Sequence, residues 1–159
     1  MRDRPDWLPP SLIFKGDWEA FLNQVYSVFE RELKLYPKPV YRGYVVFHDN
    51  RLIDSDKEEG FWHLISRQNR LRRERLPEIA RAERITWVRA VIDNVGREEV
   101  VEFDYLEARG TVRTYLWLRS YDYVVILEKK KKVAFLVTAY NVDNDWEREK
   151  LNKKYRKRL

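Results

Sequence analysis

His63 is the residue of this sequence whose chemistry stands out, because its imidazole can exchange a proton near neutral pH. The ordinary pKa of histidine, about 6.5, lies close to neutrality. His63 stands in a short apolar island and is followed by Ser66 and Arg67, where an arginine-rich segment begins. His63 could therefore transfer a proton while the Arg67 guanidinium holds a phosphate. The alternative is a half-buried histidine that hydrogen-bonds a backbone carbonyl. The second histidine, His48, is interpreted as a loop residue.

Thr138 and Tyr140 close an apolar stretch late in the chain and would share one face of a strand, because strand side chains alternate. The Thr138 hydroxyl could donate to a phosphate oxygen, and Tyr140 could stack on a base. Equally, they could be a threonine favoured by β propensity and an aromatic residue at the edge of the core. Arg89 lies beside Trp87, off the apolar stripe of a predicted helix, and points either into the same cleft or into solvent.

The positive charge of the chain is clustered in two segments. The net charge is +6, with seven arginines against three glutamates between Arg67 and Arg84, and seven basic residues against two acidic ones between Glu147 and Arg158. Such clusters favour a polyanionic partner, and guanidinium groups match phosphate bidentately. The alternative is a highly charged surface of the thermophile type. If the partner is RNA, we expect phosphate contacts from a set of clustered basic side chains: Arg70, Arg72, Arg73, Lys153 and Lys154.

Several functional classes are disfavoured by what the sequence lacks. The absence of cysteine excludes disulfides and thiolate metal sites, and two histidines argue against a multi-histidine metal centre. There is no Gly-x-Gly phosphate loop and no Gly-x-Ser-x-Gly elbow. No apolar run is long enough for a membrane helix, and the charged N-terminus is not a signal peptide. We therefore expect a cytoplasmic protein without a metal, a cofactor or a membrane partner.

The hydrophobic patterns predict a single α+β domain over residues 1–159, with helices in its first half. Residues 1–16 read as an extended arm. Residues 17–96 form a helical half, with a helix over 18–35 capped by Asp17 and a second helix over 78–94. An early strand over 41–47 interrupts them, and the apolar pair Leu52 and Ile53 could form a hairpin with it.

The second half of the chain changes to the period of β-structure. Residues 97–141 hold four strand-like stretches, at 99–106, 111–119, 121–128 and 133–140, with connections too short for parallel crossovers. They predict a four-stranded antiparallel sheet meander, with the two most apolar stretches at its centre and the lysines at 129–132 in a hairpin turn. Residues 142–159 predict a basic C-terminal helix. The expected order is N-terminal helices, sheet and basic helix.

Three short motifs within this order resemble the barnase–EndoU–colicin–RelE group of metal-independent ribonucleases, in particular its phage- and toxin-associated members. The motifs are Gly-Phe-Trp-His-Leu-Ile-Ser-Arg at 60–67, the arginine-bearing helix at 81–89, and Val-Thr-Ala-Tyr at 137–140. The resemblance covers about residues 41–140. It implies that His63, Arg67 and Thr138 are catalytic and that Arg89 and Tyr140 bind substrate. Relatives often use a second basic catalytic group, which this sequence does not identify.

The resemblance implies an endoribonuclease that cuts tRNA or another structured RNA and leaves 2′,3′-cyclic phosphate ends. It also implies an acidic antitoxin or immunity protein as a partner. Two alternatives remain open from the residues themselves. One is a nucleic-acid-binding module without catalysis, which needs the basic clusters but no titrating residue. The other is a protein-interaction scaffold, for which the six tryptophans would supply anchors.

Overall fold

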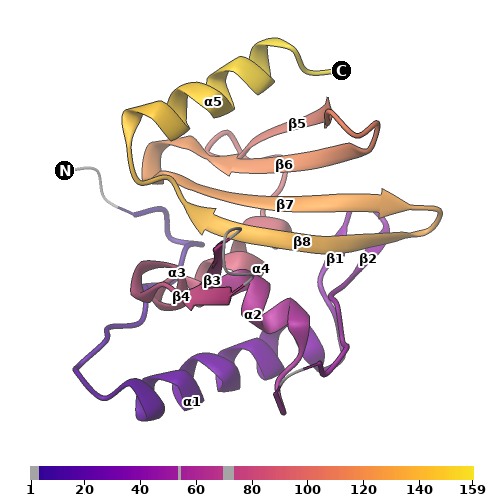
Figure 1. Cartoon of the computed structure of the whole chain (residues 1–159). Coiled ribbons are helices and arrows are strands. Elements are labelled where there is room, and N and C mark those ends of the chain that lie inside the picture. Colours follow the sequence, from indigo (N-terminus) through magenta and orange to yellow (C-terminus); the bar gives the residue numbers. More distant parts are fainter. Residues whose placement is uncertain (1–3, 54, 70–73) are drawn as a thin grey trace.

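The computed structural model describes residues 4–53, 55–69 and 74–159, and it contains one large mixed sheet between two layers of helices (Figure 1). The helices are α1 (Trp18–Phe29), α2 (Glu59–Ile65), α3 (Ile79–Glu83), α4 (Ile85–Asp93) and α5 (Asp145–Arg156). The strands are β1 (Val40–Tyr41), β2 (Tyr44–Phe47), β3 (Ser66–Asn69), β4 (Glu74–Pro77), β5 (Val101–Leu106), β6 (Val112–Leu118), β7 (Tyr123–Lys130) and β8 (Val133–Asn141). The fold class is therefore α+β, as the sequence predicts.

The large sheet has six strands in the order β1-β2-β8-β7-β6-β5, and β3 pairs with β4 in a separate hairpin. The antiparallel meander β5–β8 is confirmed, and β7 and β8 are central as predicted. The prediction of a four-stranded, purely antiparallel sheet is wrong, because the β1–β2 hairpin joins the meander through a parallel pairing of β2 with β8. That pairing joins residues some ninety positions apart, which a local hydrophobic pattern does not encode.

The N-terminal helices follow the apolar pattern, with local interruptions. The side chain of Asp17 caps α1 by accepting a hydrogen bond from the Ala20 amide, as predicted. The predicted helix over 18–35 ends as a π-helical turn, Glu30–Lys34. The predicted helix over 78–94 is divided at Arg84, which leaves the helical conformation between α3 and α4. Leu52 and Ile53 belong to no strand and are exposed, so the predicted hairpin with β2 is not formed.

Side chains join the two edges of the curled sheet. The β1–β2 turn is formed by Arg42 and Gly43, both with positive φ, as a tight hairpin requires. From this turn the Arg42 guanidinium donates two hydrogen bonds of 2.7 Å to Glu102 on β5, and the Tyr41 hydroxyl donates to the same carboxylate. Because β1 and β5 are the outermost strands, these contacts hold the sheet as a half-barrel.

The two faces of the sheet are covered differently (Figure 1). Helices α1–α4 lie on one side and enclose the larger apolar cluster, whereas α5 crosses the other side over a smaller one around Phe103, Tyr115 and Trp117. Leu151 is the buried residue of α5. None of the helices in the described part of the chain is long and apolar enough to cross a membrane.

Candidate nucleic-acid interface

His63 and Thr138, which are 75 positions apart in the sequence, meet at one edge of β8. The Thr138 hydroxyl donates a hydrogen bond of 2.8 Å to the backbone carbonyl of His63. This contact is available because β2 pairs with β8 only as far as Phe135, and α2 packs against the strand beyond that point. A register shift after Leu136 leaves Val137 as the extra residue of a bulge, which sets the direction of Thr138. The Thr138 hydroxyl thus meets the backbone of His63, and the expected meeting of this hydroxyl with the imidazole itself stays a prediction.

The imidazole of His63 lies in a charged setting at the surface. The residue is exposed, yet the protein around the ring removes enough solvent to lower its pKa below the ordinary value. Asp49 acts in the opposite sense and Arg51 in the same sense as burial. The neutral form of His63 is therefore favoured at neutral pH. A neutral imidazole is the form that accepts a proton.

The segment that carries Asp49 and Arg51 is fixed against the start of α2. Their backbone carbonyls accept hydrogen bonds from the amides of Gly60, at 2.7 Å, and Glu59, at 2.9 Å, so the segment caps the helix in place of a side chain. Arg51 also donates to both carboxylate oxygens of Asp49, which lowers the pKa of Asp49 to about 2. Asp49 is thus a permanent anion beside His63. A Cβ at Gly60 would lie 2.9 Å from the Asp49 carbonyl oxygen, so this approach requires glycine.

A chain of charged groups continues from Arg67 to the far end of β8. Arg67 is exposed and forms an ion pair of 3.2 Å with Glu78, which also pairs with Arg81 at 3.2 Å. Arg81 donates a hydrogen bond of 2.7 Å to the Ser66 carbonyl, and its guanidinium lies 5.4 Å from the centre of the Tyr140 ring. Glu78 therefore holds two guanidinium groups on the same side of the molecule as β8.

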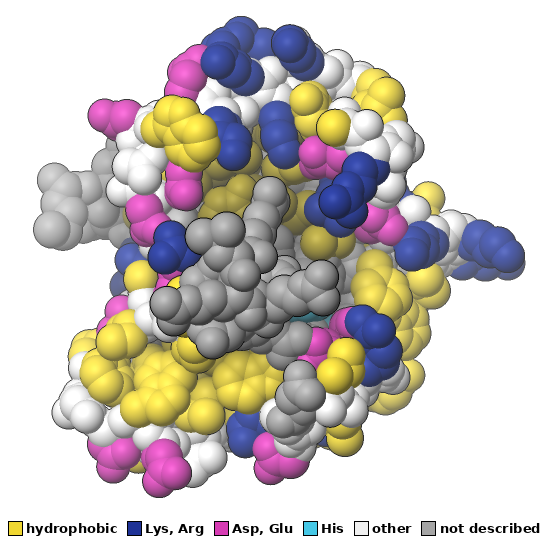
Figure 2. All heavy atoms as spheres, viewed as in Figure 1, with side chains coloured by type: hydrophobic (Ala, Val, Ile, Leu, Met, Phe, Trp, Pro, Cys, Tyr) yellow, Lys and Arg dark blue, Asp and Glu magenta, His cyan; other side chains and the backbone are white. Residues whose placement is uncertain are grey.

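A basic pocket of ≈ 350 Å³ lies between α3, β8 and α5. Its lining consists of Arg81, Tyr140, Glu147, Lys150, Leu151 and Lys154. Burial raises the pKa of Tyr140 to about 12, and Glu147 contributes in the same direction, so the phenol keeps its proton at neutral pH. Figure 2 shows Lys and Arg side chains gathered over α5, above a hollow with a hydrophobic floor. The pocket thus offers cationic groups and a phenolic donor to an anion.

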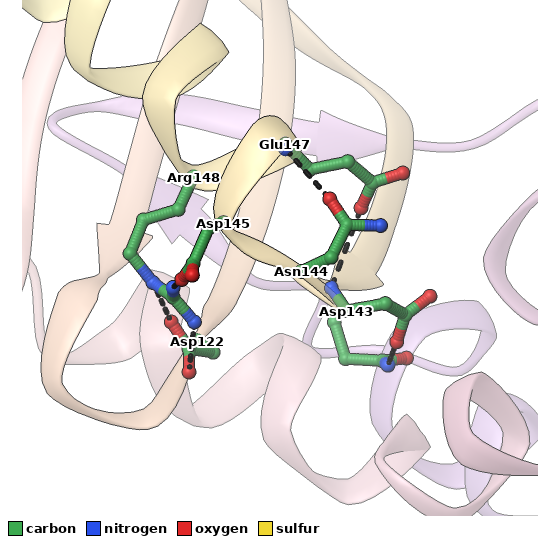
Figure 3. A network of polar contacts seen from close by, with 7 residues as sticks. Asp122, Asp143, Asn144, Asp145, Glu147 and Arg148 are labelled. Carbon is green, nitrogen blue, oxygen red and sulfur yellow. Dashed lines mark hydrogen bonds and ion pairs between the residues drawn. The ribbon is translucent and has the colours of Figure 1, made fainter.

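A polar network fixes the start of α5 and with it this wall of the pocket (Figure 3). The Asn144 side chain caps the helix by accepting from the Glu147 amide at 2.9 Å, and the Glu147 carboxylate accepts from the Asp143 amide. Arg148 donates two hydrogen bonds of 2.9 Å to Asp122, which lies just before β7 in a left-handed conformation. The helix is therefore held by its first two turns, and its lysines project from a fixed axis.

Other residues expected in the interface have different surroundings. Arg89 donates to the backbone carbonyls of Glu32 and Pro37, at 2.8 and 2.7 Å, and so joins α4 to the end of the first helix instead of facing the pocket. Lys154 lines the pocket but is paired with Glu107 at 3.2 Å and donates to the Tyr115 hydroxyl. Lys153 is exposed on α5. Arg70, Arg72 and Arg73 lie outside the described residues.

His48 comes directly before Asp49 and lines a separate pocket, together with Lys38 and Glu58. It is only 8% exposed, and the edge of its ring meets Phe29 at 4.8 Å between centroids. Burial, followed by the nearby Lys38, lowers the pKa of His48 to about 4. His48 lies in a loop, as the sequence predicts, but its side chain is buried like that of a core residue.

Comparison with protein-family models, with curated proteins and with solved structures found no match to this chain. The structure adds site residues that the sequence reasoning did not select, namely Asp49, Arg51 and Glu78. Each acts through its position in a loop or at a helix start, so no spacing motif marks them. Within the described part of the chain, no cluster of three or more His, Asp or Glu side chains could hold a metal ion.

Proposed function

We propose that this chain binds RNA along β8 and cleaves it by metal-independent transesterification at His63. The observation that supports this most is the hydrogen bond that joins Thr138 to the His63 carbonyl, since it places a strand-end hydroxyl and the exposed imidazole-bearing turn at one edge. Arg67 and Arg81, held by Glu78, supply positive charge beside it. The basic pocket at the end of β8, with its cationic groups and phenol, suits a phosphodiester better than an apolar ligand.

In the proposed reaction, the ribose 2′-oxygen attacks phosphorus and the bond from phosphorus to the 5′-oxygen breaks. His63, neutral because its pKa is lowered, accepts the proton of the 2′-hydroxyl. Tyr140 gives a proton to the departing 5′-oxygen, for which a phenol of pKa about 12 is still a stronger acid than the alcohol formed. Arg67 stabilises the charge of the phosphorane, and Thr138 can turn its hydroxyl proton towards a phosphate oxygen. The products are a 2′,3′-cyclic phosphate and a free 5′-hydroxyl.

The proposal is tested by incubating the protein with RNA in the presence of EDTA. We expect cleavage that leaves cyclic phosphate ends and that fails on an RNA with a 2′-deoxyribose at the cleavage position. His63→Gln should lower the rate about 10²–10⁴-fold, as the loss of a general base does. His48→Gln is the matched control and should retain cleavage, because the side chain of His48 is buried.

Two results would overturn the proposal. One is cleavage that His63→Gln leaves unchanged, and the other is salt-sensitive RNA binding without any cleavage. The second result would favour the non-catalytic nucleic-acid-binding module. Tyr140→Phe divides the roles further, because it keeps the ring and removes the proton donor. It should slow cleavage far more than it weakens RNA binding, because the ring and the cationic groups of the pocket remain.

A further inference from the structure

The outer face of α5 carries a tryptophan followed by lysines at helical spacing. Trp146, Lys150 and Lys153 stand in α5 at positions i, i+4 and i+7, and Lys157, which caps the C-terminal end of the helix, follows at i+11. These positions fall on one side of a helix, and we call this set the α5 stripe. The stripe points away from Leu151, which is buried against the sheet. All four members are exposed, and Trp146 is 68% exposed. The stripe is therefore an open surface of the molecule.

The fold does not account for Trp146. Asn144 and Arg148 fix the start of α5, and Leu151 anchors the helix by packing into the apolar cluster. In the described part of the chain, the ring of Trp146 contacts Lys150, whose ammonium lies 4.5 Å from the ring centre. A single exposed ring is common on protein surfaces, so what points to a ligand here is the cation beside Trp146 and the row of lysines that follows it.

We propose that the α5 stripe binds unpaired nucleotides of the RNA, with Trp146 stacking on a base and the lysines contacting the adjacent phosphates. A tryptophan face beside a cation matches one nucleotide, which presents a flat base and a negative charge. The stripe spans roughly 16 Å along the helix axis, enough for a few nucleotides. A duplex keeps its bases stacked inside, so Trp146 can reach a base only where the strand is unpaired.

The stripe also continues into the candidate active site. Lys150 belongs to the stripe and lines the basic pocket that contains Tyr140, and Tyr140 is two residues from Thr138 on β8. An RNA strand on the outside of α5 therefore has a cationic path to the edge where His63 lies. This inference rests on the proposed function, because it takes RNA as the ligand. It adds that the bound strand is single-stranded next to the cleavage point.

A matched control occurs elsewhere in the chain. Tyr36 is 77% exposed, and the Lys38 ammonium lies 5.6 Å from the centre of its ring. This aromatic–lysine pair lies in the loop between the first helix and β1, where Lys34 lines the same pocket, and it has no helical row of lysines like that of α5. If exposure of an aromatic ring beside a lysine were sufficient for RNA binding, the two pairs would respond alike.

The test measures binding of a short RNA whose riboses are 2′-O-methylated, because it lacks the attacking hydroxyl and stays intact whether or not the protein is a ribonuclease. The affinity is compared for the single strand and for its duplex with a complementary strand. We expect Trp146→Ala to weaken binding of the single strand about tenfold, the effect of losing one stacked base. Duplex binding should not change, and Tyr36→Ala should change neither. Lys150→Ala should weaken both and reduce the dependence of binding on salt.

The proposed role of the α5 stripe is wrong if Trp146→Ala weakens binding of the single strand and of the duplex equally, or weakens neither. It is also wrong if Tyr36→Ala causes an equal loss. The failure of each proposal can be recognised separately. If RNA is cleaved but its binding does not depend on Trp146, the ribonuclease proposal stands and the proposed role of the α5 stripe is wrong. If binding depends on Trp146 but no RNA is cleaved, the α5 stripe stands and the ribonuclease proposal is wrong. Absence of RNA binding at low salt contradicts both.

Discussion

The surroundings of the two histidines differ more than their positions do. The two histidines are linked through α2, because a Cβ at Gly60, three residues before His63, would lie 2.9 Å from both the His48 Cβ and the Asp49 carbonyl oxygen. Burial is the largest cause of the lowered pKa at both histidines, but it lowers the pKa of His48 to about 4, where the ring packs against Phe29. His63 remains exposed among charged groups and next to Thr138. The comparison teaches that the neighbours assign one histidine to the core and the other to the surface where chemistry can occur.

The largest effect that should separate the two histidines is on stability in acid. His48 has a folded-state pKa of about 4, below the ordinary value, so the unfolded chain binds its proton first as the pH falls. The contribution of His48 is fully present above about pH 6.5 and is lost progressively towards pH 4, by up to about 3 kcal/mol. Urea unfolding across this range should show the loss. His48→Leu should remove it, and His63→Gln should retain most of it. The same acid slope in His48→Leu as in the unchanged chain would contradict this account.

A second effect concerns the contact that links the two histidines. Gly60→Ala in a helix would ordinarily stabilise the chain, because alanine is the better helix former. Here the new methyl group would lie 2.9 Å from the Asp49 carbonyl oxygen and 2.9 Å from the His48 Cβ. We therefore expect Gly60→Ala to lower the free energy of unfolding by about 1–3 kcal/mol. Denaturant unfolding measures this change in the free energy of unfolding. If Gly60→Ala raised it, the Asp49 segment would not be held against α2.

A smaller effect on stability should follow from loss of the hydrogen bond between Thr138 and the His63 carbonyl. Thr138→Val keeps the shape of the side chain and leaves the His63 carbonyl without its donor, at a cost of about 1 kcal/mol. Thr138→Ser retains the hydroxyl and serves as the control. Cleavage should slow with valine and persist with serine, while the acid sensitivity due to His48 stays unchanged in both. If valine and serine behave alike in cleavage and stability, the hydroxyl has no part in the site.

The local patterns of the sequence predict the meander well and the rest of the sheet poorly. The strands β5–β8 pair with their neighbours in the chain, so their alternation and short turns determine the arrangement. The β1–β2 hairpin reaches β8 across most of the chain, and α2 is a single short apolar island, so neither leaves a strong periodic signal. Non-local pairing depends on the whole core and not on local propensity.

The candidate site shows the same limit. Residue type and the resemblance indicate His63 and Thr138, and in the structure the Thr138 hydroxyl donates one hydrogen bond to the backbone carbonyl of His63. Composition alone does not separate a free cation from a paired one. Lys154 looks like a phosphate contact in the sequence but pairs with Glu107, and Arg89 is occupied by backbone carbonyls. Such roles depend on groups that are remote in the sequence.

The pH dependence of RNA cleavage, measured in single turnovers, tests the role of His63 most directly. A base with a lowered pKa must lose its proton before it can act, so the rate should rise with pH and level off below the ordinary histidine pKa. The account predicts that this rise disappears in His63→Gln and persists in His48→Gln. A rise that persists unchanged in His63→Gln, or one that depends on His48 instead, would contradict it.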